Sequence, residues 1–169
     1  MPGTFMVDYG KLIEEEKARH DSAIAAAQAR RERELDLIAF FRNVEIDLGL
    51  EMAKANIELK KRGAPGITGP FRPVKDEETI ELAFGTRSPR CRLSLQTTSA
   101  HVGLANIVVE LLDETGVFIG RKKYVIEGEA SELKAYQSLI EGFPDHSAEA
   151  ASSTIAQEII SGIIRGRFV

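Results

Sequence analysis

The sequence predicts an α+β protein in which one very long helix precedes a small antiparallel sheet. Residues 8–62 contain no proline and only two glycines, and they consist mainly of strong helix formers such as Ala, Glu, Lys, Arg and Leu. After residue 78 the apolar period changes from helical to about two, which is typical of strands. We therefore predict an oligomerisation helix within residues 1–62, a linker rich in proline and glycine at 63–77, and a small α+β domain at 78–169.

The composition is typical of a folded, soluble chain, with 43% hydrophobic and 28% charged residues among 169. A net charge of -4 supplies no general attraction to nucleic acid or to anionic membranes. Cys91 is the single cysteine, so neither an intramolecular disulfide nor a metal site made of cysteines alone can form. The first residues lack the pattern of a secretory signal, and no apolar run is long enough to span a membrane. We therefore expect a cytoplasmic protein without membrane contact.

The apolar residues in the second half of the helix fall on two faces, because each residue advances by about 100° around the axis. One row consists of Leu37, Phe41, Val44, Leu48, Met52, Ala55 and Leu59. The other row, nearly opposite, consists of Leu35, Ala39, Ile46, Leu50, Ala53 and Ile57. Each apolar face needs a surface to pack against. In one interpretation, one row packs against the chain's own sheet and the other packs against a second copy of the helix.

An apolar residue also recurs every eleven positions along the helix, at Ile13, Ile24, Leu35, Ile46 and Ile57. This spacing is close to the period of a straight helix and predicts a coiled coil or bundle with little left-handed supercoil. A strict heptad fits worse because it places charged residues in the seam. We favour a homo-oligomer, a dimer or higher, over a long helix packed within one globular domain. The predicted interface residues are Ile13, Ile24, Leu35, Leu37, Phe41, Ile46, Leu48, Met52, Ile57 and Leu59.

Four strands joined by short loops predict an antiparallel meander. Alternating apolar residues indicate strands at about 79–84 and 90–96, and a strand at about 104–112 is apolar on both faces. A turn with glycine then leads into a fourth strand at about 117–127.

One or two helices complete the predicted fold after the meander. The first is a short helix from Ser131 to Glu141 that ends at a glycine. A longer helix, capped by Asp145 or Ser147, extends to about Ile164. Its wide apolar face is suited to cover one side of the sheet.

No residue pattern indicates catalysis, a metal ion or a cofactor. The three histidines lack the spacing of metal ligands, no glycine-rich phosphate loop follows a strand, and paired carboxylates occur only where a strand begins or a turn lies. Cys91 falls on the same side of its strand as Leu93 and Leu95, so we interpret it as a buried apolar residue. A reactive thiol beside Arg90 and Arg92 is the alternative. We therefore assign no catalytic residue, no metal ligand and no cofactor, and we favour a role that is not enzymatic.

Basic residues gather near the predicted hairpins. The candidate contacts for phosphate or nucleic acid are Arg87, Arg90, Arg92, Arg121, Lys122 and Lys123. Charges on strands also prevent sheets from aggregating, and few aromatic residues interleave with this group, so nucleic acid is the less favoured partner.

Three hypotheses for function follow from these patterns. We favour a homo-oligomeric scaffold or interaction protein that assembles through its long helix and presents its sheet to another protein. A nucleic-acid-binding or regulatory module that uses the basic hairpins is the second. A small-ligand-binding or enzymatic α+β domain is the third, and only fold-level analogy supports it.

Overall fold

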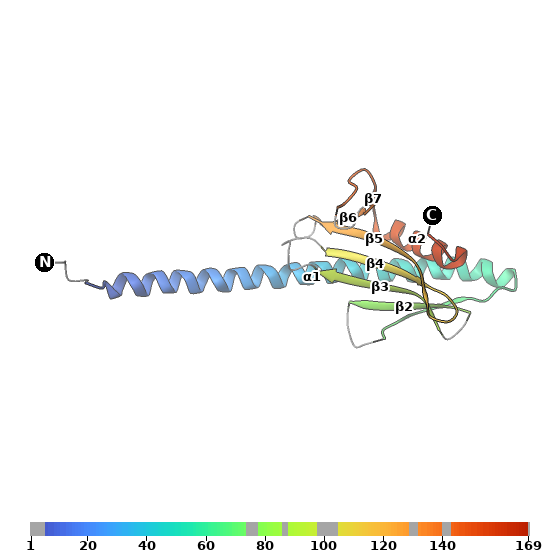
Figure 1. The fold of residues 1–169 in the computed structure, drawn as a ribbon, viewed down its shortest axis with the longest axis horizontal. Helices are drawn as coiled ribbons and strands as arrows, with labels where there is room; N and C mark the ends of the chain where they lie inside the picture. The colour runs from blue at the N-terminus through green and yellow to red at the C-terminus, as the bar shows by residue number, and fades with distance from the viewer. Residues whose placement is uncertain are drawn as a thin grey trace. The chain divides into compact units, whose positions relative to one another are not determined.

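The computed structural model describes residues 6–73, 78–85, 88–97, 105–128, 132–139 and 143–168. Within these ranges two helices and seven strands follow one another along the chain (Figure 1). They are α1 (Tyr9–Lys61), β1 (Ile67–Phe71), β2 (Thr79–Phe84), β3 (Pro89–Thr97), β4 (Ala105–Leu112), β5 (Phe118–Glu127), β6 (Lys134–Gln137), β7 (Glu149–Ala150) and α2 (Ser152–Arg165). The chain divides into two compact units, Met1–Leu35 and Asp36–Val169, so that α1 continues from the first into the second.

The long helix α1 confirms the prediction for residues 8–62 almost to the residue. Asp8 caps its N-terminus, because the Asp8 carboxylate accepts a hydrogen bond from the backbone N–H of Lys11 at 3.1 Å. In the first unit nearly all of its side chains are exposed, and charged pairs such as Arg19 with Glu16 at 3.2 Å add modest local support. This part of the helix depends on the intrinsic preference of its residues rather than on a packed face.

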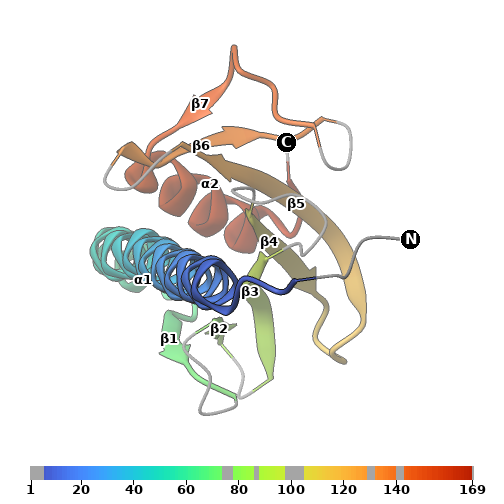
Figure 2. The ribbon, with the colours of Figure 1, turned by 90° about the vertical axis from the view of Figure 1, so that its left-hand side faces the viewer.

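The second unit contains one seven-stranded sheet in which each strand pairs with the next in antiparallel fashion. The four strands predicted from the sequence are β2 to β5, so the meander is confirmed and three further strands extend it. The sheet is curled, and the second half of α1 lies beside α2 on its concave face (Figure 2). Among the described residues, no helix combines the length and the apolar character required to cross a membrane.

The core fills the space between the concave face of the sheet and the two helices. Cross-strand register aligns the inward residues in rows, such as Ile80 with Leu93 and Leu93 with Val109. Phe41 and Leu48 of α1 and their neighbours cover these rows. Cys91 is buried among them, and burial raises the pKa of its thiol, which confirms the interpretation as a buried apolar residue.

The helix predicted for Ser131–Glu141 is wrong. Residues 134–137 form strand β6, which pairs with β5 through contacts such as Ile126 with Ala135. Residues 131 and 140–141 of the predicted helix lie outside the described residues. A short segment with moderate helix preference becomes a strand here because the ten-residue strand β5 offers an edge whose backbone groups need partners.

The second predicted helix begins later than expected. Its cap was assigned to Asp145 or Ser147, but Asp145 instead closes a turn, where its carboxylate accepts a hydrogen bond from the Ser147 backbone at 3.1 Å. Glu149–Ala150 then pair with β6 as strand β7, and α2 starts at Ser152 after Ala151, which supplies no side-chain cap. The Ser152 hydroxyl donates to the Asp47 carboxylate of α1, so the start of α2 is attached to α1.

Strand β1 lies within the segment that the sequence predicts to be a linker. Ile67 and Thr68 pair with Phe84 and Ala83 of β2, so part of this segment extends the sheet. The side-chain amide of Asn56 in α1 bonds the backbone of Ile67 on its free side. A proline-rich stretch is tolerated here because β1 is an edge strand, where one side of the backbone has no neighbouring strand.

Candidate functional site on helix α1

The most distinctive surface of the second unit is an apolar row on the exposed side of α1. This outer row, as we name it, consists of Ala39, Ile46, Leu50, Ala53 and Ile57. Its three large side chains remain 62% (Ile46), 58% (Leu50) and 59% (Ile57) exposed. With about 100° of rotation per residue, the five side chains fall within a sector of about 60°, on the side of the helix opposite Leu48.

The predicted interface residues separate into two groups in the structure. Leu37, Phe41, Leu48 and Met52 are buried in the chain's own core, and Leu59 packs against it. Ile46 and Ile57 point away from that core, as part of the outer row. The row that contains Phe41 is thus the one covered by the chain's own sheet, and only the opposite row is available to another molecule.

The first unit exposes the remaining three members of the predicted interface. Ile13, Ile24 and Leu35 are all exposed large hydrophobic residues. Ile13 has the exposed Tyr9 and Leu12 beside it, whereas the neighbours of Ile24 and Leu35 along the helix are mostly charged, polar or small. The apolar surface of the second unit is denser, since Ile46, Leu50, Ala53 and Ile57 follow one another at spacings of four, three and four residues.

Charged residues border the outer row on both sides. Arg42 and Lys60 lie along one margin, and Lys54 and Lys61 lie along the other. Three of them pair with carboxylates of the same helix: Arg42 with Glu45 at 3.7 Å, Lys54 with Glu51 at 3.2 Å and Lys61 with Glu58 at 3.3 Å. The row is therefore an apolar strip with a polar margin, which is the composition of a protein–protein contact.

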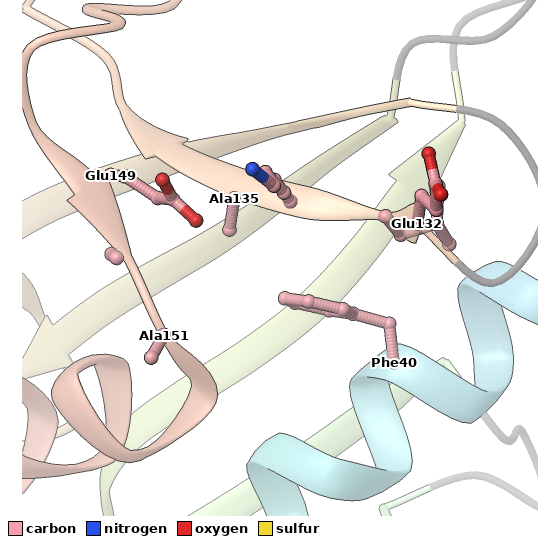
Figure 3. Close-up of a pocket in the computed structure, with 8 residues that line it drawn as sticks. Phe40, Glu132, Ala135, Glu149 and Ala151 are labelled. Carbon is pink, nitrogen blue, oxygen red and sulfur yellow. The ribbon is translucent and has the colours of Figure 1, made fainter.

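A hollow of about 600 Å³ lies beside α1, where β6, β7 and the start of α2 meet (Figure 3). The ring of Phe40 extends toward β6, with Ala135 behind it, and the carboxylates of Glu132 and Glu149 lie on either side. The eight lining residues include no histidine, cysteine or hydroxyl group, so they offer no pair of nucleophile and base. Its size suits a small ligand, but the lining identifies no chemistry. Sequence reasoning missed it because its residues come from three segments that are far apart in the sequence.

A polar cluster attaches α2 to the sheet on the inner side. The Glu158 carboxylate accepts hydrogen bonds from the Tyr124 hydroxyl and from Gln137 Nε2 at 2.9 Å, and it pairs with Lys122 Nζ at 2.8 Å. Burial, together with the Glu158 carboxylate, raises the pKa of Tyr124 well above its ordinary value. Three donors thus satisfy the hydrogen-bonding capacity of the one carboxylate that α2 places against the sheet. We therefore assign the cluster a structural role.

The structure separates the predicted phosphate contacts by face: Arg92, Arg121 and Lys123 share the convex face of the sheet, where Glu110 lies between Arg92 and Arg121. Lys122 points inward to Glu158, whereas its neighbours Arg121 and Lys123 lie on the convex face, since successive residues of a strand alternate between faces. Arg90 pairs with Glu114 at 3.7 Å. Arg87 lies outside the described residues.

Acidic and basic side chains alternate across the convex face of the sheet. Glu81 is level with Arg92, Arg92 with Glu110, and Glu110 with Arg121, on four successive strands. Arg92 and Glu81 form an ion pair at 3.2 Å. This ladder of alternating charge stabilises neighbouring strands and offers no excess of positive charge to a phosphate backbone.

A cation site is not indicated, because the described residues hold no cluster of three or more His, Cys, Asp and Glu side chains that could bind a metal ion. The choice of the outer row as the candidate functional site therefore rests on the geometry of that row.

Comparison of the whole chain with family models, with curated proteins and with solved structures gives no match.

Proposed function

We propose that this chain is a self-associating interaction protein in which the outer row of α1 pairs with the outer row of a second copy. The observation that carries the proposal is the position of this row. It lies directly opposite the face that the chain's own sheet covers, on a helix that is apolar on two sides. A surface helix that serves only one domain needs only one apolar face.

The free energy available for self-association can be estimated from the apolar side chains that the contact would bury. Complete burial of an isoleucine or leucine side chain stabilises a complex by about 1.5–3 kcal/mol relative to leaving it in water. Ile46, Leu50 and Ile57 are each more than half exposed, so each retains roughly 1–2 kcal/mol that an interface can release. Six such side chains in a symmetric pair release roughly 6–12 kcal/mol, which is of the same order as the cost of association, about 4–15 kcal/mol.

As a scaffold, the pair would present two copies of the sheet to another protein. The convex face is the surface that α1 and α2 leave uncovered (Figure 2). Its alternating charges, from Glu81 to Arg121, suit a partner with a complementary pattern of both signs rather than a uniformly charged one.

The two other functions are less well supported. Nucleic-acid binding loses support because Arg90, Arg92 and Lys122 each pair with a carboxylate of the chain. Titration with duplex and single-stranded nucleic acid at two salt concentrations tests it, since phosphate-driven binding weakens as salt rises. Small-ligand binding stays a hypothesis because of the hollow that Phe40 lines, but the lining residues do not indicate a particular ligand.

Sedimentation equilibrium of the full chain over a wide concentration range tests self-association. We expect a dimer that dissociates when Ile46→Asp and Leu50→Asp are combined, because two carboxylates would then have to be buried in the contact. Leu139→Asp is the matched control, since Leu139 is an apolar residue that is 79% exposed on the β6–β7 connection. A folded wild-type chain that stays monomeric at every concentration would refute the proposal, as would a double variant that still dimerises.

A further inference from the structure

Three residues of the outer row are spaced symmetrically, which bears on how two copies would meet. Ala39 and Ala53 are each seven residues from Ile46, one before it and one after it. Seven residues are close to two helical turns, so all three lie on nearly the same line along α1. When one helix is turned end for end about Ile46, Ala39 comes opposite Ala53 and Ile46 opposite Ile46, while Leu50 comes level with Arg42 and Ile57 with Leu35.

Small residues at these places permit close approach of two helix backbones. Ala39 and Ala53 carry only a methyl group, and Gly49 lies at the margin of the row with open space where a Cβ would stand. The distance between packed helices, about 8–10 Å, is set by the side chains at the contact. Alanine opposite alanine, on both sides of a central pair of isoleucines, gives a contact in which large and small residues alternate along the seam.

The charges at the margin distinguish the two orientations of the pair. In a parallel pair each residue is level with its own copy, so Lys60 of one copy would lie beside Lys61 of the other across the seam, and all four lysines would gather at one end. In the antiparallel pair Arg42 is level with Leu50, and the two ends that carry Lys60 lie far apart. Antiparallel packing also brings Asp36 of each copy nearly level with Lys54 of the other, on the same side of the seam. Within residues 36–61, opposite charges therefore meet in the antiparallel orientation and like charges in the parallel one.

We infer that two copies pair antiparallel along the outer row of α1, with Ile46 on the two-fold axis and Ala39 of each copy against Ala53 of the other. This inference rests on the proposed self-association. Such a contact is isologous and closes at two copies, so it forms a dimer rather than a filament. Because each outer row faces away from its own sheet, the two sheets lie on the outer sides of the helix pair, with both convex faces available.

Cysteine cross-linking of the full chain tests the orientation. Ala39→Cys and Ala53→Cys are made separately, one with a size tag, and each is oxidised alone and after mixing. We expect the mixed disulfide between position 39 of one copy and position 53 of the other, and little cross-linking of either variant alone. Wild-type chain is the control for Cys91, which is buried and whose thiol pKa burial raises.

The outcomes separate the inference from the proposed function. If each variant cross-links to itself and mixing adds nothing, the pair is parallel and the inference is overturned while self-association stands. If sedimentation shows a dimer that no combination of these cysteines cross-links, the contact lies elsewhere and both the register and the orientation are wrong. If sedimentation shows only monomer, the proposed function itself fails. Ile46→Cys, which sits on the axis, should cross-link to itself, and its failure to do so in a dimer would place the contact away from Ile46.

Discussion

Asn56 of α1 bonds both backbone polar groups of Ile67 in the edge strand β1. Asn56 Nδ2 donates to the Ile67 carbonyl at 2.8 Å, and the Ile67 N–H donates to Asn56 Oδ1 at 2.8 Å. The primary amide thus takes the place of the neighbouring strand that an edge strand lacks. Because the Ile67 side chain is also buried in the core, this pair of bonds fixes where the chain re-enters the sheet after α1 ends.

Replacing Asn56 should therefore destabilise the second unit. Asn56→Ala leaves the N–H and C=O of Ile67 unpaired at a partly buried position, and we expect a loss of about 1–3 kcal/mol in the free energy of unfolding. Urea unfolding followed by circular dichroism measures the loss. Asn43→Ala is the control, because Asn43 is an exposed asparagine on the same helix. Equal effects of the two variants would show that the bonds to Ile67 contribute nothing.

Gly162 of α2 should not tolerate alanine, although glycine inside a helix is normally the less stable choice. A Cβ built at Gly162 would stand 2.6 Å from Cε1 of Phe168, whose ring folds back after α2 ends at Gly166. We expect Gly162→Ala to lower the free energy of unfolding by about 1–3 kcal/mol, the usual cost of an overpacked contact.

The same pair provides its own control by double substitution. In a chain that carries Phe168→Ala the obstacle is gone, so adding Gly162→Ala should be neutral or stabilising, by up to about 1 kcal/mol. Thermal unfolding of the four variants gives the coupling between the two positions. Additive effects would indicate that the Phe168 ring does not pack on Gly162.

Tyr124 should make the protein sensitive to alkali. Burial and the hydrogen bond to Glu158 raise the pKa of Tyr124 in the folded state, whereas an unfolded tyrosine has a pKa of about 10. The stability contributed by the neutral phenol is therefore complete below about pH 10 and is lost as the pH rises further, because only the unfolded chain then releases its proton.

Tyr124→Phe should accordingly show a shallower fall in stability above about pH 10 than the wild type. Unfolding by urea at several pH values measures the slope, and Tyr136→Phe serves as the matched substitution on the neighbouring strand β6. Parallel slopes for wild type and Tyr124→Phe would mean that this hydroxyl does not control the alkaline transition.

The anchoring of α2 through Glu158 gives a further prediction. Glu158→Leu removes the acceptor of Tyr124, Gln137 and Lys122 together, and leaves these polar groups partly buried without it. We expect a loss of about 1–3 kcal/mol, the cost of leaving partly buried polar groups without their hydrogen-bond partner, with α2 losing hydrogen-exchange protection before the β3–β4 pair does. The exposed Glu149→Leu in the same unit is the control. Uniform loss of protection across the unit would argue that α2 is not a separate cooperative element.

Local sequence determined the elements whose signal is long or regular. The helix α1 follows from more than fifty consecutive residues without proline, and β2 to β5 follow from apolar alternation because each strand has one face in the core. Strands β6 and β7 have four and two residues, too few for a period to show, and they form because β5 offers an edge to pair with. Strand β1 is equally hidden, since its five residues show no period and its place depends on pairing with β2 and on the hydrogen bonds from Asn56.

For the candidate site, the sequence by itself determined that the second half of α1 has two apolar faces, because helical period alone fixes which residues share a side. The sequence did not determine which of the two faces packs against the chain's own sheet. Only the tertiary structure decided that, by packing Phe41 and Leu48 into the curled sheet and leaving Ile46 and Leu50 outside. The physical reason is that periodicity is a property of one helix, whereas burial depends on the shape of the surface against which that helix packs.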